Sequence, residues 1–208
     1  DIPHMAKHLD GIEVTEIFNR ALVAVQGPKA EDVVGDLCPA VRDMKFMETT
    51  LADIMGVECR ISRLGYTGED GFEISIPEDK AIEICRAFLA HDDCEPVGLG
   101  ARDSLRLESG LCLYGNDIDN ATSPVEASLT WAMQKRRRED GGFPGAARIQ
   151  RDLADGVAKK LVGIRPTGRA PARAGVEVQD TDGNSIGAIT SGGFGPTVGA
   201  PVAMGYVA

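Results

Sequence analysis

The segment that most constrains the fold is residues 98–110, a helix-like run that places charged side chains among leucines. At about 100° per residue, Arg102, Arg106 and Ser109 fall on one stripe, with leucines on both sides of it. The pattern predicts a helix whose two arginines lie along a half-buried face. Because an arginine stays charged, burial of its guanidinium requires carboxylates or planar acceptors as partners.

Two kinds of partner are open for these arginines. Internal partners would make the segment a structural ion-pair network beneath a domain junction. An external partner would be an anionic or heteroaromatic ligand, held against the loop after Gly110, where glycine, asparagine and proline favour turns. The internal candidates are four acidic residues, Asp103, Glu108, Asp117 and Asp119.

A second feature is a predicted hairpin. Residues 57–64 and 72–76 each alternate as half-buried strands do, and the turn between them is punctuated by glycine. Alternation puts Phe72 on the core face and Glu73 on the opposite face. Tyr66, Glu69 and Asp70 lie in the turn, so together with Glu73 they form a polar set at the hairpin.

The overall pattern predicts an α+β fold. Strands and helices alternate up to residue 110, which is typical of a sheet covered by helices. From Lys160 onward only short strands follow, at residues 161–164, 176–179, 185–190 and 202–207, which predicts a small antiparallel, barrel-like β domain. We therefore expect a first domain at residues 1–140, a linker at 141–158 and a truncated β domain at 159–208.

The formal net charge of −10 argues against nucleic acid and anionic membranes as partners, since both require a basic surface. The local exception is the run Lys135, Arg136, Arg137 and Arg138. Such a run is typical of a helix end, where cations suit the dipole, and the alternative is a docking patch for an acidic partner. No apolar run reaches the length of a membrane span. Five cysteines without a CxxC pair predict reduced, packed thiols and no metal site.

The chain lacks the sequence motifs of serine hydrolases, zinc proteases, P-loop enzymes and dinucleotide-binding folds. The remaining candidate for a binding site is a set of polar residues that includes Glu73 and Arg102. If the hairpin packs against the helix, the carboxylate accepts hydrogen bonds from ring N–H and amino groups while the guanidinium donates to ring nitrogen or oxygen. The edge of a pterin offers that combination. A structural salt bridge between Glu73 and Arg102 is the alternative.

Several stretches carry a likeness to a known family. They include Gly65-Tyr-Thr-Gly-Glu-Asp-Gly71 within residues 62–76, Arg102-Asp-Ser-Leu-Arg-Leu-Glu108 within residues 98–119, and the shorter segments 22–28, 122–126, 135–138, 187–192 and 203–207. On these residues the chain resembles the aminomethyltransferase, or T protein, family of the glycine cleavage system. The likeness covers nearly the whole chain.

The resemblance implies that a one-carbon unit moves from the aminomethyl group on the lipoyl arm of H protein to tetrahydrofolate, with release of ammonia. It also implies that Glu73 and Arg102 contact the folate and that Tyr66 lies beside the pterin. Lipoylated H protein is the implied partner, and Lys135 to Arg138 are the candidate docking patch. The implied compartment is the bacterial cytoplasm or the mitochondrial matrix.

The resemblance also predicts what this chain lacks. The family's catalytic aspartate is expected upstream of Asp1, so no residue here is assigned a catalytic role, and the family's last domain is expected to continue past Ala208. The chain alone should therefore be inactive or nearly so. Two other functions stay open: the folate-binding portion of a dimethylglycine or sarcosine dehydrogenase, and a folate-binding module without chemistry.

Overall fold

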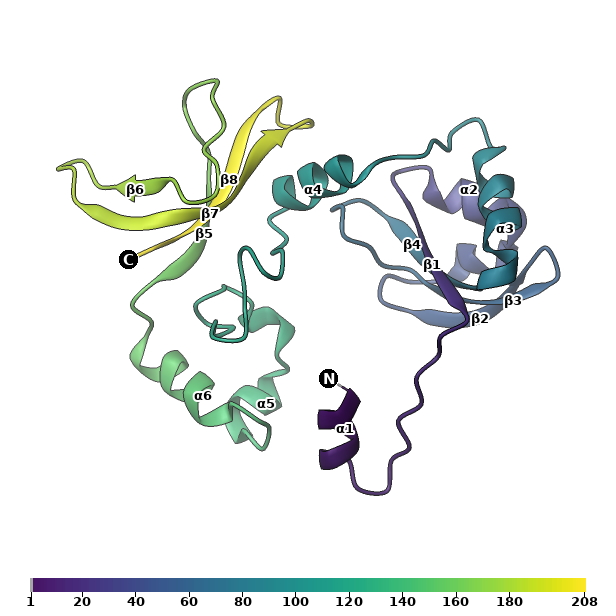
Figure 1. The fold of residues 1–208 in the computed structure, drawn as a ribbon, viewed down its shortest axis with the longest axis horizontal. Helices are drawn as coiled ribbons and strands as arrows, with labels where there is room; N and C mark the ends of the chain where they lie inside the picture. The colour runs from purple at the N-terminus through teal and green to yellow at the C-terminus, as the bar shows by residue number, and fades with distance from the viewer. Residues whose placement is uncertain (1) are drawn as a thin grey trace. The chain divides into compact units, whose positions relative to one another are not determined.

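A computed structural model describes residues 2–208. The chain divides into two compact units, each with its own four-stranded sheet (Figure 1). Residues up to 65, together with 69–96, form the first unit, and residues 66–68 with 97–208 form the second. A short helix, α1 (Ile2–His8), precedes the first sheet. The fold is α+β with antiparallel sheets, as the sequence predicts.

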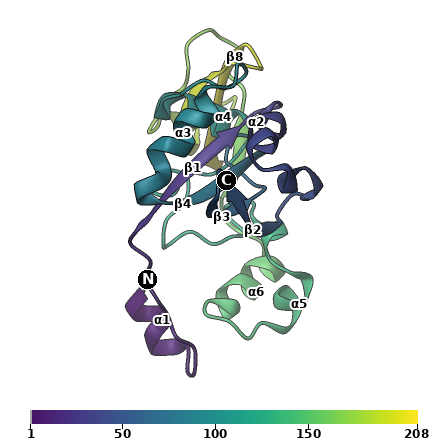
Figure 2. The same ribbon diagram turned by 90° about the vertical axis from the view of Figure 1, so that its right-hand side faces the viewer.

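The sheet of the first unit has the order β1-β4-β3-β2. In Figure 2 this unit faces the viewer, with β1 in front. The predicted hairpin is confirmed, because β3 and β4 pair antiparallel. A second hairpin, between β2 and β3, was not expected. It turns on two residues with positive φ, Met55 at 54° and Gly56 at 77°, as tight hairpin turns require. The strands are β1 (Arg20–Gln26), β2 (Thr49–Ile54), β3 (Val57–Ser62) and β4 (Gly71–Pro77).

Two helices share one hydrophobic core with this sheet. They are α2 (Ala30–Leu37) and α3 (Ala81–Leu89), accompanied by the 3₁₀ turns Pro39–Asp43 and Glu78–Lys80. Alternate residues of β4 supply the centre of the core: Phe72, Ile74 and Ile76 are fully buried. Burial of each such side chain contributes roughly 1.5–3 kcal/mol. The opposite face of β4 is left free for polar residues.

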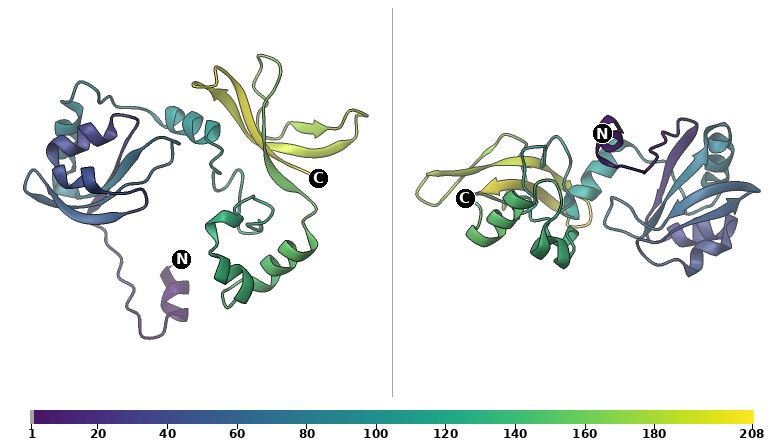
Figure 3. Two further views of the ribbon diagram at one scale, coloured as in Figure 1. Left: turned by 180° about the vertical axis from the view of Figure 1, so that it is seen from behind. Right: turned by 90° about the horizontal axis from the view of Figure 1, so that it is seen from below.

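The second unit begins with α4 (Leu99–Glu108) and ends in a sheet of order β5-β8-β7-β6. Figure 3 shows α4 beside the long β7–β8 ribbon, and the two strands contact it. Residues 141–158, expected as a linker, include α6 (Ala146–Asp155), and the domain boundary stays a prediction. The remaining elements are the 3₁₀ turn Thr130–Ala132, α5 (Lys135–Asp140), β5 (Lys160–Ile164), β6 (Glu177–Gln179), β7 (Ser185–Gly195) and β8 (Ala200–Val207). In the described chain, no helix combines the length and hydropathy needed to cross a bilayer.

The first prediction tests which face of the first sheet is the core. Replacing Phe72 by Ala should lower the free energy of unfolding by about 3–5 kcal/mol, because the substitution leaves a cavity in a packed interior. Leu22→Ala is the control, since Leu22 on β1 is 68% exposed and its loss should change stability by less than about 0.5 kcal/mol. Urea denaturation followed by circular dichroism measures both, and equal losses would contradict the assignment.

Candidate functional site

Glu73 lies on β4, on the face of the sheet opposite the core. Its half-buried side chain stands next to fully buried Phe72, so the predicted alternation is confirmed. Its register partners are Ala24 on β1 and Ser62 on β3, whose side chains share its face. The Ser62 hydroxyl is hydrogen-bonded to the Thr49 hydroxyl at 2.9 Å. The cross-strand neighbours of Glu73 on this face are therefore both small.

Tyr66 and Arg102 come together in the second unit. The Arg102 guanidinium carbon lies 4.9 Å from the centre of the Tyr66 ring, a cation–π contact. The Tyr66 hydroxyl donates to the backbone carbonyl of Cys112, and burial raises the pKa of this hydroxyl, so it stays a donor at neutral pH. The hydroxyl and the ring of Tyr66 therefore each have a partner. The ring packs against the guanidinium of Arg102, which is an exposed residue.

The structure brings two of the three expected folate residues together. Tyr66 and Arg102 are in contact, whereas Glu73 belongs to the other unit. The pairing of Glu73 with Arg102 around one ligand therefore stays a prediction.

The second arginine of α4, Arg106, is only 2% exposed and has internal partners. Its Nε donates to Asp103 Oδ1 at 2.8 Å, its Nη1 to Asp117 Oδ2 at 2.7 Å and its Nη2 to Ser191 Oγ at 3.0 Å. Burial alone would lower the pKa of Arg106, but the hydrogen bonds to both carboxylates outweigh it and the pKa is raised. Arg106 therefore belongs to a structural network.

Of the four acids expected to pair with the arginines, two do so, Asp103 and Asp117. Glu108 instead accepts hydrogen bonds from the backbone N–H groups of Thr197 and Val198, in the turn between β7 and β8. Asp119 accepts from the Thr122 hydroxyl at 2.7 Å. The expectation that both arginines would be half-buried is wrong, since Arg106 is buried and Arg102 is exposed.

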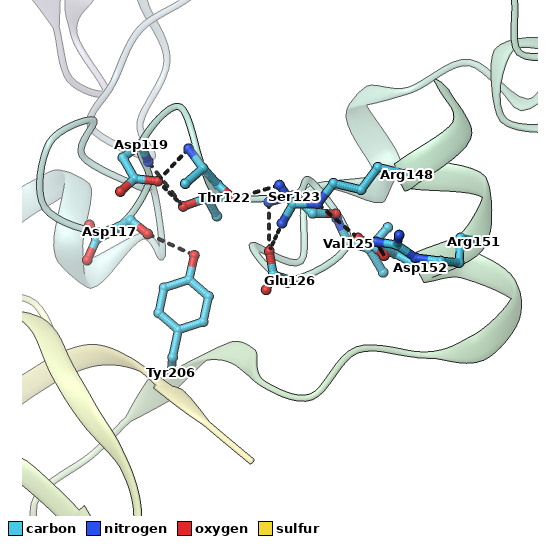
Figure 4. Close-up of polar contacts among 11 residues, drawn as sticks. Asp117, Asp119, Thr122, Ser123, Val125, Glu126, Arg148, Arg151, Asp152 and Tyr206 are labelled. Atoms are coloured by element: carbon cyan, nitrogen blue, oxygen red, sulfur yellow. Dashed lines mark hydrogen bonds and ion pairs between the residues drawn. The ribbon is translucent and has the colours of Figure 1, made fainter. Parts of the chain in front are cut away.

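Asp117 joins the loop after α4 to the second sheet. Its carboxylate accepts from Arg106, from the Leu113 backbone N–H at 2.8 Å and from the Thr190 hydroxyl on β7. Its backbone carbonyl accepts from the Tyr206 hydroxyl on β8 at 2.8 Å (Figure 4). With 1% of its surface exposed, Asp117 is the buried centre of the network.

A second polar cluster links residues 122–126 to α6, as Figure 4 shows. Glu126 Oε2 accepts from the Ser123 backbone N–H and from Arg148 Nη2, each at 2.8 Å. Hydrogen bonds from the Ser123 hydroxyl and from Arg151 lower the pKa of Asp152. Sequence reasoning missed these α6 residues, although Arg148 and Asp152 are four apart, the spacing at which side chains of one helix meet.

The basic run Lys135 to Arg138 makes up most of the short helix α5, and Arg137 and Arg138 lie in its last turn. The helix dipole favours cations in that turn, so the helix-end interpretation holds for Arg137 and Arg138. Lys135 lies 3.6 Å from Glu139, a weak exposed pair. The alternative interpretation, a docking patch, remains.

An open cavity of about 410 Å³ lies beside the end of α4. Its lining is mainly apolar and comes from the end of α4, residues 127–131 and the strands β5 and β8. Cys112 lines it, and burial raises the pKa of this thiol, so Cys112 is protonated and unreactive at neutral pH. Its lining also includes Arg165 and Glu108, and the Glu108 carboxylate is already bonded to the turn between β7 and β8.

The buried network generates the second prediction. Asp117→Ala should lower the free energy of unfolding by about 3–5 kcal/mol, because it removes the buried carboxylate that pairs with the buried Arg106 charge and leaves only the exposed Asp103. Asp103→Ala is the matched control: it removes the other carboxylate from Arg106, but its side chain is 59% exposed, so the loss should be below about 1 kcal/mol. Urea denaturation followed by fluorescence of Trp131, the chain's single tryptophan, reports on this unit. Similar losses for both variants would contradict the role of Asp117.

Two family models match the chain: the GCVT N-terminal domain over residues 1–137 and the Glycine cleavage T-protein C-terminal barrel domain over residues 159–208. A probable mitochondrial aminomethyltransferase of Schizosaccharomyces pombe is 47% identical over 212 residues, covering 100% of this chain and 54% of that protein. The mitochondrial aminomethyltransferase of Pisum sativum is 49% identical over 217 residues, covering 100% of this chain and 53% of that protein.

A crystal structure of the glycine cleavage system aminomethyltransferase T from Bartonella henselae matches with a TM-score of 0.89 and 44% sequence identity. The match covers 99% of this chain and 56% of that one. The chain thus spans about half the length of the relatives it matches. Both parts of the sequence and its fold lead to one conclusion: the chain belongs to the glycine cleavage T-protein family.

Proposed function

We propose that this chain is the folate-binding part of an aminomethyltransferase of the glycine cleavage system. The enzyme moves the one-carbon unit from the aminomethyl-lipoyl arm of H protein to tetrahydrofolate and releases ammonia. The observation that carries the proposal is the contrast between the two arginines of α4. Arg106 is surrounded by internal partners, whereas the Tyr66 ring is the partner found for exposed Arg102 among the described residues.

The chemistry of the three side chains fits a pterin. A carboxylate such as Glu73 accepts from the ring N–H and amino groups, and a guanidinium such as Arg102 donates to ring nitrogen and oxygen. The Tyr66 ring holds the guanidinium in one orientation before the ligand arrives, which lowers the entropic cost of binding. We assign binding and orientation to these residues, and no proton transfer.

In this reaction the main task of the enzyme is to hold N5 of the folate against the aminomethyl carbon. Holding two reactants in a reactive geometry can supply about 7–11 kcal/mol of the barrier. The residues of this chain would contribute by fixing the heterocycle.

Two other functions were open on sequence grounds. The relatives cited above bear the name aminomethyltransferase, which supports transfer from H protein over the folate-binding portion of a dimethylglycine or sarcosine dehydrogenase. The charge of the second unit supports a role beyond simple folate binding. Residues 135–173 carry 11 of the chain's 22 basic residues and 4 of its 32 acidic residues. A basic segment in an otherwise acidic chain favours an acidic protein partner, which we take to be lipoylated H protein, docking on Lys135 to Arg138.

Arg102 generates the third prediction. Arg102→Ala should weaken the binding of a tetrahydrofolate analogue by about 2 kcal/mol, since a charged hydrogen bond is lost. Isothermal titration of the purified chain measures the change. Arg169→Ala, an exposed arginine of the same unit, is the control and should leave affinity unchanged. Equal affinities of the Arg102 variant and the unaltered chain would remove Arg102 from the site.

The docking patch generates the fourth prediction. Replacing Lys135, Arg136 and Arg137 by Gln should weaken the binding of lipoylated H protein and flatten its dependence on salt, because exposed charges are screened within about 10 Å at 0.1 M salt. Arg138 stays unchanged, since its Nε is buried. The control replaces Lys7, Lys29 and Lys45 by Gln, with the same change in net charge. A similar effect of both triple variants would show that α5 is not a specific docking surface.

A further inference from the structure

Following the chain along β4, Glu73 is the first residue that pairs with β3. The register of the two strands runs from Arg60 opposite Ser75 to Ser62 opposite Glu73, and the pairing then stops. On the other side, β4 stays paired with β1 as far as Gly71. Between Glu73 and Gly71, β4 is therefore paired with β1 but no longer with β3. The residue that follows Ser62 is Arg63.

The Arg63 side chain connects neighbouring segments at the point where the pairing of β3 with β4 ends. Its guanidinium binds Asp70 through two hydrogen bonds, Nε to Oδ1 at 3.0 Å and Nη2 to Oδ2 at 2.5 Å. It also binds Glu31 Oε2 on α2 at 2.6 Å and the Met44 carbonyl oxygen at 2.8 Å. The side chain is only 14% exposed. A planar fork bound to three segments at once has one permitted orientation.

These contacts lead directly to the beginning of β4. Asp70 Oδ1 accepts from the Gly71 backbone N–H at 2.9 Å, and the Asp70 carbonyl accepts from the Gly27 N–H at 2.9 Å. The Arg63 guanidinium also lies 5.4 Å from the centre of the Phe72 ring. Hydrogen bonding to Arg63 lowers the pKa of Asp70, so both partners stay charged at neutral pH. Arg63 thus fixes the two residues that precede Phe72 and the ring of Phe72 itself.

The turn between β3 and β4 is tightly packed at its two ends, Gly65 and Gly71. The Gln26 side chain occupies the space in which a Cβ at Gly65 or Gly71 would stand, at 1.8 Å and 2.5 Å from its nearest atoms. Gln26 Nε2 also donates to the Leu64 carbonyl at 3.1 Å. A shift of Asp70 would therefore be passed along the strand, because the packing around Gly71 leaves nothing to absorb it.

We propose that Arg63 is a positioning residue for the folate site: through Asp70 and Phe72 it sets the direction in which Glu73 presents its carboxylate. This inference rests on the proposed function, in which Glu73 binds the pterin. Arg63 itself does not touch the ligand. A stabilising ion pair without this role would affect folding and leave the geometry of Glu73 unchanged.

A double-mutant cycle separates the two roles, with affinity for a tetrahydrofolate analogue measured under conditions in which every variant is folded. Arg63→Ala should weaken binding at least tenfold in the unaltered chain and less than twofold in a Glu73→Gln background, because the residue acts through Glu73. Arg63→Lys should recover part of the affinity, since it keeps the charge and loses the fork. Equal losses in both backgrounds would overturn the proposal.

Arg42→Ala is the matched control. Arg42 belongs to the same unit and binds Asp36 at 2.8 Å, but its contacts lie on α2 and not on β4. It should leave folate affinity unchanged. If Arg63→Ala does not fold, Asp70→Asn and Arg63→Lys carry the same cycle, because each weakens the pair from one side.

A readout without ligand keeps this inference apart from the proposed function. The ¹³C signal of the Glu73 carboxylate should shift in Arg63→Lys and Asp70→Asn and stay in place in Arg42→Ala. An unshifted Glu73 signal would overturn the positioning role even if folate binds. Failure of the unaltered chain to bind any folate would contradict the proposed function, while a shifted Glu73 signal in the same sample would still support the role of Arg63.

Discussion

The second unit depends on one buried ion pair, Arg106 with Asp117. Each partner is almost fully enclosed, and each uses its remaining hydrogen-bonding capacity on a different segment. A charge removed from water is tolerated only when such partners replace the solvent. The pair therefore forces α4, the loop that follows it and the sheet into one arrangement. The position of Arg102 and Tyr66 follows from that arrangement, because Tyr66 is bonded to the same loop at Cys112.

The two arginines of α4 show how one helix face can serve two purposes. Arg106 lies in the last turn, where Leu107 and Glu108 also meet β7 and its turn to β8. Arg102 lies one turn earlier, where its contact is the Tyr66 ring. The difference in exposure comes from where the helix meets the sheet and not from the residue type. Spacing along the sequence places both arginines on one stripe but does not show where that stripe is covered.

Local patterns were enough to predict much of the fold. The glycine-rich turn before Phe72 and the alternation around it predicted the hairpin, and the short strands after Lys160 predicted the second sheet. The strand β2 was missed because its turn uses Met55 with positive φ, a residue that does not mark such turns in a sequence. The partners of Arg106 were only half predicted. Asp103 and Asp117 are near in sequence, whereas Ser191 is 85 residues away and no local pattern connects it with α4.

That separation has a consequence for how the protein is made. Tyr206 reaches the Asp117 carbonyl across 89 residues, and Ser191 reaches Arg106 across 85. A chain emerging from the ribosome therefore presents α4 and the two carboxylates that pair with Arg106 long before Ser191 and Tyr206, which complete the network, exist. The described contacts within the first unit join residues up to 96, so they can form earlier in translation than those that tie α4 to β7 and β8.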